Sequence, residues 1–191
     1  TIGLGNSVRN MTISGTELQN ITATGLTIGD ATNGDITVDG ISAANSNNIT
    51  GTVTLNATNG GASISISNGG STFNALTVNA GSAVTGNITL VTDTGGLTVN
   101  AGAGVTFNDT VTTAGAIAID ADTDDNGTGT FTLNNLLNTT NNTLSIIADD
   151  VVLSNTINTG AAATTITVSD GGTIGLGATA GGMTISGAEL Q

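Results

Sequence analysis

Short triplets with an aliphatic residue on each side of a Thr, Ser or Ala recur along most of the chain, from Leu26-Thr27-Ile28 to Ile166-Thr167-Val168. In an extended strand, this alternation places both aliphatic side chains on one face and the middle residue on the other. Every second triplet is separated by roughly 20 to 24 residues, a period typical of a solenoid with two or three strands per turn. The pattern predicts strands throughout and no helix.

Glycine and asparagine lie between the triplets, for example at Asn33-Gly34, Asn59-Gly60 and Asn68-Gly69. Both residues tolerate positive φ, so they mark the corners between strands. We therefore expect an all-β fold, a right-handed parallel β-helix with about eight coils per repeat unit. At ~4.8 Å per coil, one unit would advance about 40 Å along the axis. β-Sandwich repeats remain the alternative, because a sandwich uses the same strands and turns.

A duplication defines the expected repeat unit. Residues Thr1–Gln19 return as Thr173–Gln191 with 13 of 19 positions identical, at a constant offset of 172. We expect residues 1–172 to be one solenoid unit and residues 173–191 to be the start of the next. Apolar residues of the two copies are the predicted interface between repeats: Ile2, Leu4, Met11, Ile13, Leu18, Ile174, Leu176, Met183, Ile185 and Leu190. The expected partners are copies of the chain itself, as tandem repeats or as separate subunits joined end to end.

Composition argues against several function classes. Fourteen acidic residues against the single base Arg9 give a net charge of −13, which repels nucleic acids and anionic membrane surfaces. The chain contains no His, Cys, Lys, Tyr or Trp, so it lacks the usual catalytic bases and nucleophiles and the aromatic platforms that bind sugars. We expect neither an enzyme nor a nucleic-acid-binding protein, and no membrane insertion in this segment.

The stretch GGLTVNAGAGVTFNDTVTTAGAIAIDADTDDNGTGTFTLNN, Gly95–Asn135, resembles the β-strand repeats of giant bacterial surface proteins, the filamentous-haemagglutinin-like and autotransporter-like adhesins. The resemblance implies a secreted right-handed parallel β-helix at the bacterial cell surface, working as a stalk, fibre or adhesin. It implies no catalytic residues. Two functions therefore stay open: a structural filament module, and a binding module that contacts host or surface glycans.

One acidic segment is a candidate cation site. From Asp122 the order Asp-x-Asp-x-Asn-Gly matches the first half of a calcium loop, in which alternate oxygens converge on one hard cation. The twelfth position of that motif should be a bidentate Glu, but it is Leu133. The candidate calcium ligands are Asp120, Asp122, Asp124 and Asn126, and a solvated loop is the alternative. No other cofactor is expected.

Threonine rows suggest a minor alternative function. Thr-x-Thr occurs at Thr22 and Thr24, and again at Thr52 and Thr54. Regular hydroxyl and methyl arrays on a flat solenoid face can bind ice, but the spacing here is irregular. Thr is also a favourable exposed strand residue, so structural ladders are the expected role.

Overall fold

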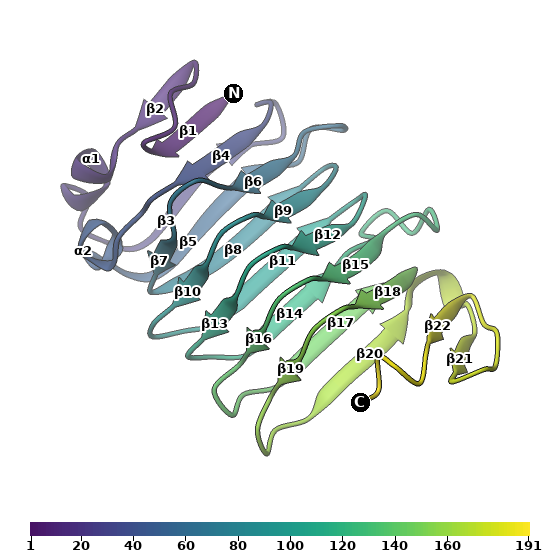
Figure 1. Cartoon of the computed structure of the whole chain (residues 1–191). Coiled ribbons are helices and arrows are strands. Elements are labelled where there is room, and N and C mark those ends of the chain that lie inside the picture. The colour runs from purple at the N-terminus through teal and green to yellow at the C-terminus, as the bar shows by residue number, and fades with distance from the viewer.

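The computed structural model describes all residues, 1–191, as a stack of coils whose strands form three parallel sheets (Figure 1). In spatial order, the first sheet contains β18 (Asp150–Leu153), β15 (Thr130–Leu133), β12 (Val105–Phe107), β9 (Val84–Gly86), β6 (Ile64–Ile66), β4 (Ile36–Asp39), β1 (Ile2–Gly5) and β2 (Met11–Ile13). The second sheet contains β19 (Ile157–Asn158), β16 (Leu137–Asn138), β13 (Val111–Thr113), β10 (Leu90–Thr92) and β7 (Ser71–Phe73). The third contains β20 (Thr164–Val168), β17 (Leu144–Ala148), β14 (Ile117–Asp120), β11 (Leu97–Ala101), β8 (Ala75–Ala80), β5 (Ile49–Ala57) and β3 (Ala23–Asp30).

Three short helices and one further strand pair complete the chain. The helices are α1 (Gly15–Gln19), α2 (Ala43–Ser46) and the 3-10 turn η1 (Ser169–Gly171). Strands β21 (Ile174–Leu176) and β22 (Met183–Ile185) form a separate two-stranded sheet near the C-terminus. The expectation of no helix was wrong for α1 and α2, which begin at capping residues Ser14 and Ser42.

The chain visits the three sheets in turn, as in β6, β7 and β8, and then returns to the first sheet one layer further along. Every strand pair is parallel, which confirms the parallel β-helix and excludes the sandwich. The structure has seven coils, where the sequence pattern predicted about eight. The first coil is long, carrying Ile2 onto Ile36, whereas a later coil carries Ile64 onto Val84. Strand β2 and helix α1 lie within the first coil and account for its extra length. Helix α1 in the first coil and α2 in the second stand where later coils have a second-sheet strand.

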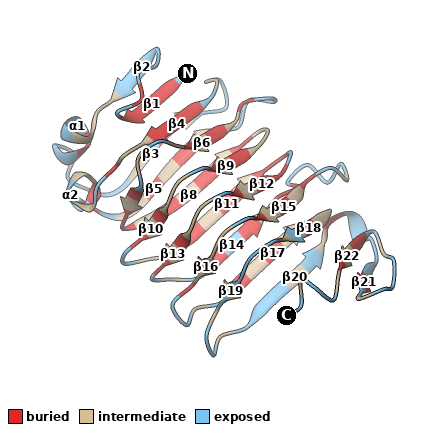
Figure 2. Cartoon of the chain, in the orientation of Figure 1, coloured by how far each residue is buried: buried red, intermediate tan, exposed pale blue.

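Aliphatic side chains stack in register through the interior. Along the third sheet Leu76 pairs with Leu97, and Leu97 pairs with Ile117, so each inward residue rests on its equivalent one coil away. Such residues belong to one hydrophobic cluster of 38 buried side chains. Figure 2 shows this as buried positions alternating with partly exposed ones along the inner strands. Each buried Leu, Ile or Val stabilises the fold by about 1.5–3 kcal/mol relative to exposure.

The three phenylalanines are fully buried: Phe73 lies in β7 of the second sheet, and Phe107 and Phe131 lie in the neighbouring strands β12 and β15 of the first. The rings of Phe107 and Phe131 meet edge to face, with centroids 5.9 Å apart and planes at 80°. Phe107 also lies over Gly86, where a Cβ would come within 3.0 Å of the ring carbon Cδ1. Gly86 and Phe107 are register partners in β9 and β12, so the ring occupies the space that a side chain at Gly86 would take.

Outward-facing asparagines form hydrogen-bonded ladders along the axis. The Asn79 amide donates to Asn56 at 2.6 Å, and Asn100 donates to Asn79 at 2.7 Å. A second ladder joins Asn108 to Asn87 and Asn134 to Asn108, each at 2.8 Å. Because Asn79 and Asn108 each donate to one coil and accept from the next, these ladders tie consecutive coils together on the outside of the solenoid.

Candidate functional site

The two copies of the duplicated segment fold alike. We call Thr1–Gln19 the N-terminal hook and Thr173–Gln191 the C-terminal hook. In each, a strand is followed by a tight loop and a second strand parallel to the first. Ile2 pairs with Met11 in one hook, and their counterparts Ile174 and Met183 pair in the other.

The loops of the two hooks pass equally close to their first strands. A Cβ at Gly3 would lie 1.9 Å from the Ser7 carbonyl oxygen, and one at the equivalent Gly175 would lie 2.0 Å from that of Thr179. Glycine is therefore required at both positions, since any larger residue would collide with backbone.

The same capping box closes both hooks. In the N-terminal hook, the Ser14 N–H and hydroxyl donate to the Glu17 carboxylate at 2.9 and 2.8 Å, and the Glu17 N–H donates back to the Ser14 hydroxyl. In the C-terminal hook, the Ser186 N–H donates to Glu189 at 2.7 Å and the Glu189 N–H donates back. Hydrogen bonds from the Ser14 N–H and hydroxyl lower the pKa of Glu17. Partial burial raises the pKa of Glu189, but bonds from Leu153 and Ser186 outweigh it, so the net shift is downward.

The surroundings of the two hooks are opposite. Met11 on β2 is 46% exposed, whereas its counterpart Met183 on β22 is fully buried. Leu176 on β21 is 57% exposed, whereas its counterpart Leu4 on β1 is fully buried. Figure 2 shows the inversion: β1 is red and β2 largely pale blue, while β22 is red and β21 shows exposed residues. Each hook therefore leaves uncovered the strand that the other hook buries.

The C-terminal hook rests on β18, the last strand of the first sheet. The Thr184 N–H donates to the Asp150 carboxylate at 3.2 Å, and the Leu153 N–H donates to the Glu189 carboxylate at 3.0 Å. Met183 and Ile185 join the hydrophobic core at this end. The strand nearest to the preceding coil is thus β22, and β21 lies beyond it.

The N-terminal hook instead touches the coil that follows it. The Ile2 N–H donates to the Asp35 carbonyl oxygen at 2.9 Å, and the Asn6 N–H donates to that of Asp39 at 2.9 Å. The Arg9 guanidinium donates to the Thr37 hydroxyl at 3.0 Å. Here β1 is the inner strand, paired with β4, and β2 is the outermost strand of the sheet.

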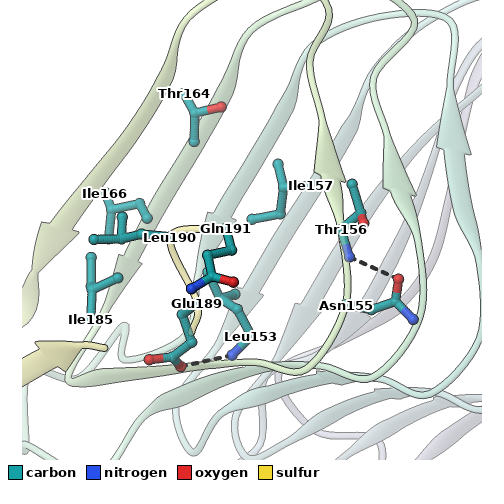
Figure 3. Close-up of a pocket in the computed structure, with 10 residues that line it drawn as sticks. All are labelled: Leu153, Asn155, Thr156, Ile157, Thr164, Ile166, Ile185, Glu189, Leu190 and Gln191. Atoms are coloured by element: carbon teal, nitrogen blue, oxygen red, sulfur yellow. Dashed lines mark hydrogen bonds between the residues drawn. The ribbon is translucent and has the colours of Figure 1, made fainter. Parts of the chain in front are cut away.

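A pocket of about 360 Å³ opens at the C-terminal end of the solenoid (Figure 3). Its walls mix aliphatic and polar side chains: Leu153, Asn155, Thr156, Ile157, Thr164, Ile166, Ile185, Glu189, Leu190 and Gln191. Leu190 and Ile166 both line this opening, as drawn in Figure 3. Leu190 is 61% exposed, whereas its counterpart Leu18 on α1 is fully buried at the other end. The pocket is therefore the end of the core that no further coil covers.

The ten predicted interface residues thus fall into two groups. Five are buried, namely Ile2, Leu4, Leu18, Met183 and Ile185, and four are exposed, namely Met11, Ile174, Leu176 and Leu190. Ile13 is partly buried against the core. Sequence comparison could not assign residues to these two groups, because the copies differ in their neighbours and hardly in their own apolar residues. The role of the ten residues as an interface between repeats stays a prediction.

The acidic segment is a hydrogen-bonded loop around a buried Asp122. The Asp122 carboxylate accepts from the Ser169 hydroxyl at 2.7 Å and from the Asn126 and Gly127 N–H groups at 3.3 and 3.2 Å. Asp124 accepts from the Asn126 side chain at 2.8 Å. The structure contains no group of three or more acidic, His or Cys side chains arranged to hold a metal ion. Calcium binding stays a prediction, which calorimetric titration with calcium chloride would test.

Charge crowding marks the same loop. Burial, with the charges of Asp125 and Asp122, raises the pKa of Asp120 against one opposing hydrogen bond from the Asp122 N–H. Desolvation and the neighbouring acids, Asp122 first, raise the pKa of Asp170. Asp170 and Ser169 come from η1, far along the chain, and no sequence motif linked them to this loop.

The comparisons with known proteins add no relative. No family model matches the chain, and searches of curated proteins and of solved structures gave no match either. None of the helices is both long enough and apolar enough to cross a membrane.

Proposed function

We propose that this chain is a structural repeat module of a secreted bacterial surface filament, in which units follow one another end to end as a long, stiff solenoid. The observation that carries the proposal is the pair of hooks, which share one local fold and expose opposite strands. The resemblance of Gly95–Asn135 to adhesin repeats supports a place at the cell surface.

Stiffness follows from the way in which the coils are joined. Neighbouring coils share parallel backbone ladders, a continuous aliphatic core and the asparagine ladders on the outside. Bending the rod would break several of these at once. Local opening is the route to proteolysis, and continuous ladders leave few segments that open easily. A single Arg and no Lys also leave almost no site for trypsin-like proteases.

Electron microscopy of the native material tests the proposal. Seven to eight layers at ~4.8 Å predict an axial repeat of about 34–38 Å per unit, together with a layer line near 4.8 Å. Discrete particles with neither spacing would contradict a filament. Binding of the isolated chain to a glycan array would instead support the adhesin function, which a solenoid stalk could also serve.

A further inference from the structure

We infer that the two hooks are the two halves of one repeat junction, and that the free edge of β21 receives the β4 strand of a following copy of the repeat. This inference rests on the proposed function and names its partner. The pairing would repeat that of β1 with β4, with Ile174 opposite a second Ile36 and Leu176 opposite a second Val38.

Strand order supplies the first step. At the C-terminal end the order along the axis is β18, β22, β21, because β22 contacts β18 and pairs with β21. At the N-terminal end the order is β2, β1, β4. Since β22 and β21 are the second copies of β2 and β1, laying one hook on the other gives the continuous series β18, β22, β21, β4. Neither end alone contains this series, and together they contain all of it.

Unfilled space and an unpaired donor at the C-terminal hook support the same partner. A Cβ at Gly5 would lie 2.0 Å from the Asp39 carbonyl oxygen of β4, whereas one at Gly177 would meet nothing within 4 Å. The Asn6 N–H donates to Asp39, whereas the N–H of its counterpart Ala178 has no backbone acceptor.

The position that α2 of a following copy would occupy beside the C-terminal hook is also empty. A Cβ at Gly15 would lie 2.8 Å from the Asn45 side chain of α2, and one at the equivalent Gly187 would meet nothing within 4 Å. A second β4 and α2 would also cover Leu190 and close the pocket, as α1 and α2 already do around Leu18.

The N-terminal hook lacks a contact that the C-terminal hook makes with the strand before it, β18. Glu189 uses one carboxylate oxygen for Ser186 and the other for the Leu153 N–H of β18. Glu17 uses one oxygen, Oε2, for Ser14, and its Oε1 has no hydrogen-bond partner. A preceding β18 would supply that partner and would cover the exposed Met11.

The geometry points to a following copy in the same chain and not to a separate subunit. In a separate subunit the edge of β4 is already occupied by that subunit's own β1, so a hook would first have to be displaced. A copy of residues 20–172 that continues after Gln191 would reach the β21 edge with its own β4 unoccupied. The junction would lack one contact, because Gly181 replaces Arg9, which bonds to Thr37 in the N-terminal hook.

Hydrogen exchange on an extended chain tests the inference. The 191-residue chain is compared with one in which residues 1–191 are followed by a second copy of residues 20–191. We expect the Ile174 and Leu176 amides to exchange at least about tenfold more slowly in the extended chain, because an edge strand becomes an interior one. Ile36→Asp in the second copy should abolish this protection. Thr98→Asp in the second copy, an outward residue of β11, is the matched control and should retain it.

A shorter extension, by residues 20–62 alone, provides β3, β4, α2 and β5 and should protect the same amides. Fast exchange of the β21 amides in both extended chains would overturn the inference. Native filaments with the predicted axial repeat would still support the proposed function in that case, so the two can fail separately.

Discussion

Removing the Phe107 ring and filling the space with a methyl group at Gly86 tests whether the layers stack in the described register. Phe107 is fully buried, so Phe107→Ala should cost about 3–5 kcal/mol, including the loss of the edge-to-face contact with Phe131. Gly86→Ala in the unaltered chain places a methyl group 3.0 Å from the ring, and such overpacking costs about 1–3 kcal/mol. The lower entropy of the unfolded chain with Ala offsets about 0.4–1 kcal/mol of that.

The sign of the Gly86 substitution should reverse in the Phe107→Ala background. The added methyl group then enters the vacated space, where one buried carbon contributes about 0.8 kcal/mol, and the entropy gain remains. The entropy term is common to both backgrounds, so the coupling energy between the two substitutions should be about 2–4 kcal/mol, the relieved overpacking plus the burial of one methyl group. Urea unfolding followed by circular dichroism is the assay, because the chain has no Trp or Tyr for fluorescence.

Leu137→Ala provides the control for this cycle, because Leu137 is also fully buried but lies in β16, two coils from β9. Gly86→Ala should have the same effect in that background as in the unaltered chain, within about 0.5 kcal/mol. If Gly86→Ala had the same effect on stability in the Phe107→Ala background as in the Leu137→Ala background, the stacking of the Phe107 ring on Gly86 would be refuted.

Three further outcomes are expected. Asn79→Ala removes two rungs of an asparagine ladder and should destabilise the fold by about 1–3 kcal/mol, roughly twice the effect of Asn56→Ala in the same urea assay. Glu189→Gln should lower stability at pH 7, and its difference from the unaltered chain should shrink as the pH falls below about 4.5; a pH-independent difference would exclude a role for the charge. Asp122→Ala should cost about 1–3 kcal/mol by leaving the Ser169 hydroxyl and two N–H groups unpaired, and it should lower the pKa of Asp170 in an NMR titration.

The strands of the first and third sheets could be predicted from sequence because they carry the alternating pattern directly. Leu97-Thr98-Val99, for example, lies within β11, with both aliphatics buried and the Thr facing outward. The second sheet was harder to predict, since strands such as β16 are only two residues long and provide too little alternation.

The sequence contains a pattern that predicts the start of helix α1, although hydrophobic periodicity does not reveal it. Ser14 and Glu17 form the Ser-x-x-Glu pattern of a capping box, and Glu189 repeats it in the second copy. A helix of five residues is too short to show a 3.6-residue period, so capping chemistry was its only mark.

Two features depended on tertiary structure and had no local signal. Met11 is exposed and Met183 is buried because β2 is the outermost strand of its sheet, whereas β22 packs against β18. The bond between Ser169 and Asp122 joins residues 47 positions apart, at a place where η1 folds over the acidic loop. Neither relation follows from residue type or spacing.

Cryo-electron microscopy of native filaments, at a resolution that traces the backbone, would show the junction between units itself. We expect an uninterrupted first sheet in which β18 is followed by β22, β21 and then the β4 strand of the next unit. A gap, a cap or a subunit boundary at β21 would contradict it.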